Sequence, residues 1–303
     1  MNWSNLFDFT DYGEILWLVR NSLVAGAVLG VLGGLIGPFI MMRDLPFAVH
    51  GISELSFAGA SAALLLGVNV VAGSTVGSLL AALVIGALGV RARERNSIVA
   101  VLMPFGLGLG ILFLALYQGR SGNKFGLLTG QIVSVDNDQL GLLIGISVLV
   151  ILVLVIVWRP LTFASVDAEV ARAKGVPVRT LSVVFMVLLG LTVAVSVQII
   201  GALLVLALLV TPAAAAMRVT ASPLFTPLLS VVFATVSVVG GILLSVGGGL
   251  PISPFVTTIS FLIYLACRLI GARRPPGSRR GARTRSAASG TGALRPPRLG
   301  SAA

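Results

Sequence analysis

The sequence predicts an all-α polytopic membrane protein with about nine transmembrane helices. Three observations predict this fold class: 57% of the 303 residues are hydrophobic, only 10% are charged, and the mean hydropathy is +1.06. Soluble domains carry roughly 25% charged residues, so the composition excludes a soluble globule, a disordered chain and a disulfide-stapled module. The apolar residues gather in runs of about 20, the length that a helix needs to cross a bilayer.

Nine apolar runs follow one another along the chain, and each predicts one span. They cover residues 15–42, 46–67, 68–90, 97–117, 139–158, 180–200, 201–217, 223–247 and 251–271. The charge-free stretch 180–217 is too long for one helix across a hydrocarbon core of about 30 Å. We therefore expect a hairpin there, with a tight turn at residues 198–201. Pro104 and Pro212 lie inside spans and are expected to kink them.

The basic residues predict the orientation of these spans. With the N-terminus outside, 18 of the 21 lysines and arginines fall on the inner side, where the positive-inside rule places them. This arrangement is N-out and C-in. Nine of the 21 lie from Arg268 onward, so the net charge of +11 belongs mainly to the end of the chain and does not indicate nucleic-acid binding. Residues 272–303 are predicted to form a disordered basic cytoplasmic tail, solvated or in contact with anionic lipid headgroups.

Motifs of soluble enzymes are absent from the sequence. There is no GxxxxGK[ST] phosphate loop, no HExxH, no CxxC and no GxSxG, so the chain lacks its own ATPase site of that kind and is not expected to be an enzyme or to bind a cofactor. Asp8, Asp11 and Glu14 precede the first run, which does not suit a cleaved signal peptide. The single cysteine, Cys267, is expected to be a packing residue. A multispan protein of this kind is expected to be a transporter or channel subunit.

One inner connection is polar and has the pattern of a short helix. It reads SVDAEVARAKGVPVRTL from residue 165 to 181. Ser165 or Asp167 is suited to cap its start, Gly175 is suited to its end, and Pro177 cannot continue it. These signals predict two to three turns of cytoplasmic helix. The helix is either a surface linker or a docking site for a soluble partner.

Three blocks of the sequence resemble the metal-uptake branch of the ABC transporter permeases, which imports zinc, manganese or iron. The inner segment, with Asp167, Ala171 and Gly175 at four-residue intervals, is similar to the coupling helix of that family. The run IIGALLVLALLVTPAAAAMR (199–218) resembles the next block, and LLTGQIVSVDNDQL (127–140) resembles an outer loop. The likeness covers roughly residues 16–270 in order.

This resemblance implies a function and a set of partners. The region 1–271 would be the permease domain of an ABC importer in the cell membrane, moving a divalent transition metal, with zinc and manganese favoured. Two copies would form a homodimer. A cytoplasmic ATPase subunit would bind ATP and dock on the segment of Asp167, Ala171 and Gly175. An extracytoplasmic metal-binding protein would deliver the metal. Membrane lipid would surround the chain.

The second predicted span holds the candidate metal ligands. The family usually has an aspartate there and, four residues on, a Ser-His pair, whereas this sequence has His50 followed by Ser53 and Glu54. The acid and the imidazole have exchanged places, yet both metal-ligand types remain one helical turn apart on one face. Glu54 lies close to mid-membrane, where a carboxylate costs about 2.5–3.5 kcal/mol or more. The alternatives are a neutral, hydrogen-bonded helix-end histidine and a glutamate that holds two helices together.

Two acidic residues lie at the predicted outer mouth. Asp138 is placed to cap the helix that follows, and together with Asp136 it could instead form an acidic funnel for cations. The connection 118–138 also contains an apolar patch that predicts either a re-entrant or an interfacial segment. Two other functions stay open: a proton-coupled secondary transporter that uses Glu54, and an ABC permease for a metal chelate.

Overall fold

The computed structural model describes residues 19–88, 92–119, 135–248 and 252–272, and every regular element within these ranges is an α-helix. The helices are α2 (Arg20–Met42), α3 (Pro46–Leu66), α4 (Val70–Leu88), α5 (Ala92–Leu116), α7 (Asn137–Val166), α8 (Ala168–Ala173), α9 (Val178–Ile200), α10 (Ala202–Leu209), α11 (Thr211–Val219), α12 (Phe225–Gly248) and α13 (Ile252–Ala272). Among these described helices, eight are long and apolar enough to cross a membrane. The predicted all-α polytopic fold is therefore confirmed.

The seventh predicted span, 201–217, is two short helices rather than one. The preceding turn falls at Gly201, whose φ of 82° is a left-handed value, so the hairpin expected at residues 198–201 is present. The chain then breaks at Val210 between α10 and α11. Pro212 lies in the first turn of α11, where a proline without an N–H group is tolerated. At Pro212 the helix is therefore interrupted, whereas only a kink was expected. As a result, the described residues contain eight continuous spans instead of nine.

The fifth predicted span is longer at its inner end than expected. Instead of stopping at Trp158, α7 continues through Pro160 to Val166, because Leu161 and Ala164 are buried in the core and hold the last turns in place. The inner connection is correspondingly shorter. The predicted cytoplasmic helix of two to three turns is α8, which has only six residues.

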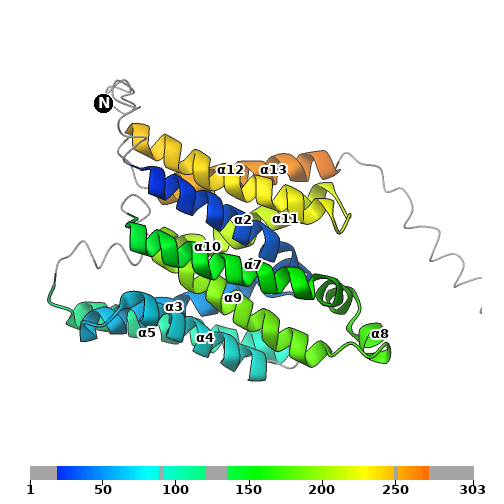
Figure 1. Cartoon of the computed structure of the whole chain (residues 1–303), viewed down its shortest axis with the longest axis horizontal. Coiled ribbons are helices and arrows are strands. Elements are labelled where there is room, and N and C mark those ends of the chain that lie inside the picture. Colours follow the sequence, from blue (N-terminus) through cyan, green and yellow to red (C-terminus); the bar gives the residue numbers. More distant parts are fainter. Residues whose placement is uncertain (1–18, 89–91, 120–134, 249–251, 273–303) are drawn as a thin grey trace, which may run out of the picture.

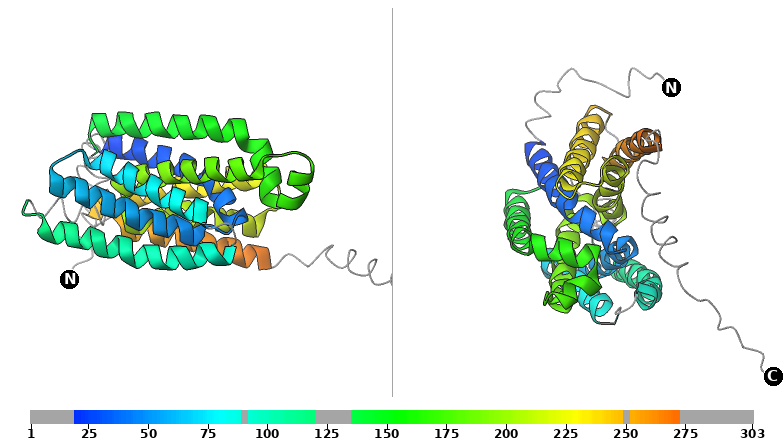
Figure 2. Two further views of the ribbon diagram at one scale, coloured as in Figure 1. Left: turned by 90° about the horizontal axis from the view of Figure 1, so that it is seen from below. Right: turned by 90° about the vertical axis from the view of Figure 1, so that its right-hand side faces the viewer.

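The bundle has two groups of helices joined by α9 (Figures 1 and 2). In one group α3 packs between α4 and α5, and in the other α12 packs against α2 and α13. The connecting helix α9 contacts α3 and α4 on one side and α2 and α7 on the other. The helices α2, α3 and α9 are the most deeply buried, whereas at most 22% of the residues in the apolar stretches of α5, α7 and α13 are buried, which suits helices that face lipid.

Glycines set the distance between α2 and α12. Gly26, Gly30 and Gly34 recur every four residues and therefore share one face of α2. A Cβ atom placed at Gly30 would lie 2.7 Å from the Cα of Thr235 on α12, so no larger residue fits without moving the helix. Small residues are what let helix backbones approach closely in lipid, where the hydrophobic effect does not drive helices together.

One end of the bundle collects the predicted inner segments. The short helix α8 and the C-terminal end of α13 lie at this end, and the described residues begin at the opposite end (Figures 1 and 2). Arg95 of α5 donates hydrogen bonds to the backbone oxygens of Arg43 and Asp44, both at 3.1 Å, which ties the start of α5 to the α2–α3 turn. The orientation of this end toward the cytoplasm stays a prediction. The predicted tail lies outside the described residues from residue 273 onward, as does most of the outer connection 118–138.

Labelling of single cysteines is expected to confirm the N-out, C-in orientation. With Cys267 removed, Lys174→Cys just after α8 should react with a membrane-impermeant maleimide only after the cell is permeabilised. Val68→Cys, in the exposed α3–α4 turn at the opposite end, should react on intact cells. The reverse pattern would overturn the orientation.

Candidate functional site

The helix α3 brings the two predicted metal ligands together. Pro46 occupies its first turn, where the fixed φ of proline favours helix initiation, and His50 and Glu54 follow one turn apart on one face. The His50 Nε2 and Glu54 Oε1 atoms lie 3.7 Å apart. Ser53, next to Glu54, donates a hydrogen bond of 2.8 Å from its Oγ to the backbone oxygen of His50, so this hydroxyl is directed back at its own helix.

Each of the two side chains has a polar atom without a partner among the residues that the structure describes. Glu54 is only 3% exposed, and its Oε2 atom is buried and accepts no hydrogen bond. His50 is half-buried, and its Nδ1 atom is likewise buried without a partner. Buried polar groups are normally hydrogen-bonded, and a carboxylate within a span is costly. The Glu54 Oε2 and His50 Nδ1 atoms are therefore available to coordinate a metal ion within a predicted membrane span.

The helix α5 packs closely on the backbone of Glu54 through a glycine. A Cβ atom at Gly106 would lie 3.0 Å from the backbone C of Glu54 and 3.2 Å from its Cβ. Closer to the start of α5, Val99 and Met103 face Gly51 of α3, where an added Cβ atom would lie 3.2 Å from Val99 and 3.7 Å from Met103. The α3–α5 contact thus fixes the backbone on which Glu54 is mounted.

Adding a methyl group at Gly106 is expected to disturb the site. Gly106→Ala must push α5 away from Glu54, and overpacking of this kind costs about 1–3 kcal/mol. We expect lower thermal stability and lower uptake in membranes or cells expressing this variant. Gly108→Ala is a matched control on the same helix, because a Cβ there meets no atom within 4 Å. Equal effects of the two substitutions would contradict the role of the close contact.

A hydroxyl network ties α3 to α4 and α9, and no pattern in the sequence predicts it. The Oγ atoms of Ser56 and Ser74 lie 3.0 Å apart, and Ser74 Oγ donates to the backbone oxygen of Ala194 at 3.2 Å. Serines inside apolar runs are too common to identify such a contact from sequence. Among the described residues no group of three His, Cys, Asp or Glu side chains lies close enough to hold a metal ion. Within the described part of the chain, His50 and Glu54 are therefore a pair of potential ligands and not a complete metal site.

The predicted coupling segment is a capped, compact turn of helix. Asp167, not Ser165, is the cap: its Oδ1 accepts from the backbone N–H groups of Glu169 and Val170, both at 3.0 Å. Ala171 is fully buried, which fastens α8 to the bundle. Gly175 ends the helix with φ of 79°, and the N–H of Val176 donates to Ala171 at 3.0 Å, as in a Schellman motif.

The acidic residues at the other end are separate from the pair on α3. Asp136 and Asp138 are both exposed. The expected capping by Asp138 is wrong, because α7 begins at Asn137 and Asp138 lies within its first turn. A carboxylate in that position is favourable to the helix dipole without acting as the cap.

Comparisons with known proteins give a consistent result. The manganese transport system membrane protein MntC of Halalkalibacterium halodurans is 29% identical over 244 residues, covering 80% of this chain and 84% of that protein. The manganese import system permease protein ScaB of Streptococcus parasanguinis is 31% identical over 215 residues, covering 69% of this chain and 75% of that protein. The solved structure of PsaBC from Streptococcus pneumoniae in complex with Fab is 25% identical, with a TM-score of 0.77 over 86% of this chain and 95% of that one.

The family assignment rests on most of the chain and not on one motif. The model of the ABC 3 transport family matches residues 16–271. A relative of 31% identity and a solved structure of the same fold support the same assignment, and the eight apolar helices are consistent with it. This multi-pass membrane protein belongs to the ABC 3 transport family.

Proposed function

We propose that this chain is the membrane-spanning permease subunit of an ABC importer that moves a divalent transition metal into the cytoplasm. The observation that carries the proposal is the buried Glu54 carboxylate, with His50 one turn away and a coordinating atom left unpaired on each side chain. Manganese is favoured over zinc as the substrate, since the relatives MntC and ScaB are named for manganese.

The imidazole and the carboxylate would contact the metal as it passes. Imidazole with carboxylate suits manganese, ferrous iron or zinc better than an all-oxygen set would. Two ligands from one chain leave a divalent ion undercoordinated, and a second copy of the chain would supply a second pair across a central path. Weak, incomplete coordination is appropriate for a transport site, because the ion must also be released.

A separate ATPase subunit would supply the energy. One support is the sequence, which contains no GxxxxGK[ST] phosphate loop. The other is α8, a short capped helix at the end of the bundle where the predicted inner segments lie. The ATPase subunit would dock on α8. ATP would bind to that subunit and not to this chain. An extracytoplasmic binding protein would present the metal at the opposite end.

Uptake measured metal by metal in a deletion strain tests the proposal. The strain should lose manganese accumulation and recover it with the wild-type gene, while free zinc and ferrous iron serve as competitors. Uptake of the same metals supplied as chelates distinguishes a permease for free metal from a permease for a metal chelate. Recovery of uptake only with a chelate would replace the free-metal proposal, and uptake that persists when ATP is depleted but a proton gradient is kept would replace the importer.

A further inference from the structure

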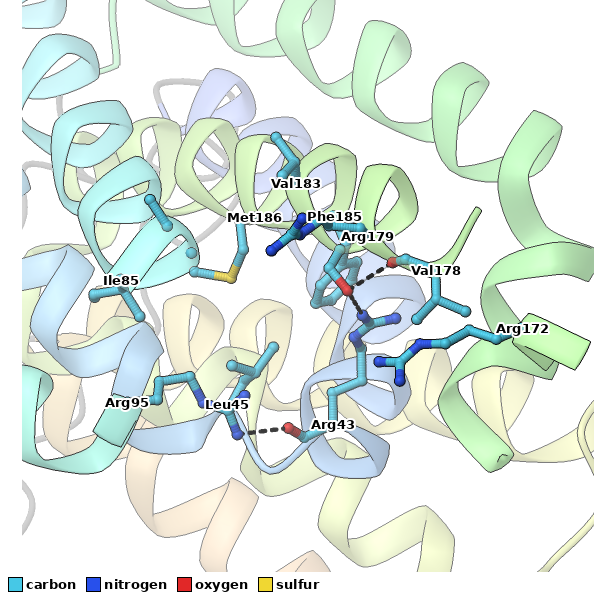
Figure 3. Close-up of a pocket in the computed structure, with 13 residues that line it drawn as sticks. Arg43, Leu45, Ile85, Arg95, Arg172, Val178, Arg179, Val183, Phe185 and Met186 are labelled. Carbon is cyan, nitrogen blue, oxygen red and sulfur yellow. Dashed lines mark hydrogen bonds between the residues drawn. The ribbon is translucent and has the colours of Figure 1, made fainter. Parts of the chain in front are cut away.

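Four arginines from four segments of the chain line one cavity at the end of the bundle that carries α8 (Figure 3). The cavity has a volume of about 600 Å³. Arg43 comes from the α2–α3 turn, Arg95 from the start of α5, Arg172 from α8 and Arg179 from the start of α9. From the sequence, each of these arginines is predicted only to add to the positive charge on the inner side. Their spacing along the chain does not predict that they line one cavity.

The charges around this cavity are unbalanced. None of the described side chains that line it is acidic. Asp44, which does not line the cavity, is near enough to act on the charge of Arg95. The described lining itself has four guanidinium groups and no carboxylate. Burial lowers the pKa of the Arg43 guanidinium from its ordinary value, and the neighbouring charge of Arg95 lowers it further. An anion in the cavity would relieve this repulsion.

The guanidinium groups of Arg43 and Arg95 are held in place by hydrogen bonds, and that of Arg95 retains one donor without a partner among the described residues. Arg43 donates from Nη1 to Ser165 Oγ at 3.2 Å and from Nη2 to Ser182 Oγ. Arg95 uses its Nη2 atom for the two backbone oxygens of the α2–α3 turn, whereas its Nε atom is buried and finds no hydrogen-bond partner in the described part of the chain. Guanidinium groups fixed in this way favour an oxyanion that accepts several hydrogen bonds at once.

Apolar side chains line the cavity beside the guanidinium groups. They are Leu45 in the turn before α3, Ile85 of α4, and Phe185 and Met186 of α9, all buried in the core. The exposed side chains Arg172 and Arg179 stand at the rim. The half-buried Arg43 and Arg95 lie among the apolar residues, so the cavity offers positive charge next to apolar surface, which suits a phosphate group that carries an apolar body. A carboxylate from a soluble protein would have to leave water and lie against the same apolar wall.

We infer that this cavity binds a phosphate group, and that an anionic phospholipid of the inner leaflet supplies it. The inner leaflet is where anionic lipids face the basic ends of membrane proteins. The inference concerns Arg43, Arg95, Arg172 and Arg179 and is independent of which metal the protein moves. It gives the arginine cluster a ligand beyond its part in orienting the chain.

Lipid binding by the full chain tests the inference. The protein is placed in nanodiscs of phosphatidylcholine, and phosphatidylglycerol is titrated in while native mass spectrometry counts the retained anionic lipid. Wild type should bind it saturably, and Arg95→Gln and Arg179→Gln should each weaken binding roughly tenfold, the loss expected for one charge-assisted hydrogen bond. Arg159→Gln is the matched control, because Arg159 is an exposed arginine of α7 at the same end that does not line the cavity.

Inorganic phosphate forms the second arm of the experiment. Saturable phosphate binding with the same dependence on Arg95 and Arg179, but no preference for phosphatidylglycerol, would keep the phosphate site and assign it to the free anion. Equal lipid retention by wild type, Arg95→Gln and Arg159→Gln would overturn the inference. Loss of the ATPase subunit from the Arg179→Gln protein, with lipid retention unchanged, would overturn it as well and assign the arginines to a protein carboxylate. Arg43 is left intact because its bonds to Ser165 and Ser182 join the α2–α3 turn to α7 and α9. Arg95→Gln also removes the bonds from α5 to the α2–α3 turn, so its melting temperature is measured as well, and the exposed Arg179 provides the variant without such bonds.

Discussion

Glu54→Gln is expected to reduce metal uptake by more than about tenfold, which corresponds to about 1.4 kcal/mol or more of lost stabilisation along the path. The substitution keeps the side-chain volume and removes the charge that would attract a divalent cation. It also removes a carboxylate that is 3% exposed and has an unpaired oxygen. Since such a charge is costly to bury, the variant should be as stable as wild type or more so.

Stability and uptake measured together separate the two roles of Glu54. A glutamate that only holds helices together would lose stability on substitution, and uptake would fall in proportion to the amount of folded protein. A metal-path glutamate would lose uptake with expression and melting temperature intact. Wild-type uptake of every tested metal by Glu54→Gln would leave Glu54 as a structural residue.

The partner ligand gives a second readout at the same site. His50→Ala should lower uptake and change the preference among manganese, zinc and iron, because a nitrogen ligand contributes most for the metals that bind imidazole well. Competition between metals, measured in cells expressing each variant, reports this preference directly. An unchanged order of preference would exclude His50 from the path.

Gly175→Pro is expected to abolish transport while the protein remains in the membrane. Gly175 has φ of 79° and its N–H donates to Arg172 at 3.0 Å. Proline is restricted to φ near −65° and has no N–H, so the end of α8 and its link to α9 must change. If α8 is the docking site, the ATPase subunit should no longer co-purify, and uptake should fall by more than about tenfold.

A matched substitution at the other end of the bundle controls for damage to the fold. Gly67 ends α3 with φ of 70° and donates its N–H to Leu64, so Gly67→Pro makes the same backbone change far from α8. That variant should keep the ATPase subunit bound. Co-purification of the ATPase with Gly175→Pro, accompanied by normal transport, would refute the docking role of α8.

The sequence by itself determined the membrane class, the order of the helices and the one-turn spacing of His50 and Glu54. Each of these follows from local properties: the length of an apolar run, the placement of charges between runs and the 3.6-residue period of a helix. The turn at Gly201 was predicted for a similar reason, because a charge-free stretch of that length cannot cross a bilayer once.

Only the tertiary structure decided which elements continue and which atoms remain unpaired. The extension of α7 past Pro160 depends on the burial of Leu161 by other helices, and the break at Val210 depends on the packing of α10 and α11 against their neighbours. The close approach of Gly106 to Glu54 is likewise a contact between distant segments. The four-arginine cavity is assembled from segments more than 130 residues apart, and no local pattern encodes a meeting of charges that would repel one another without the scaffold between them.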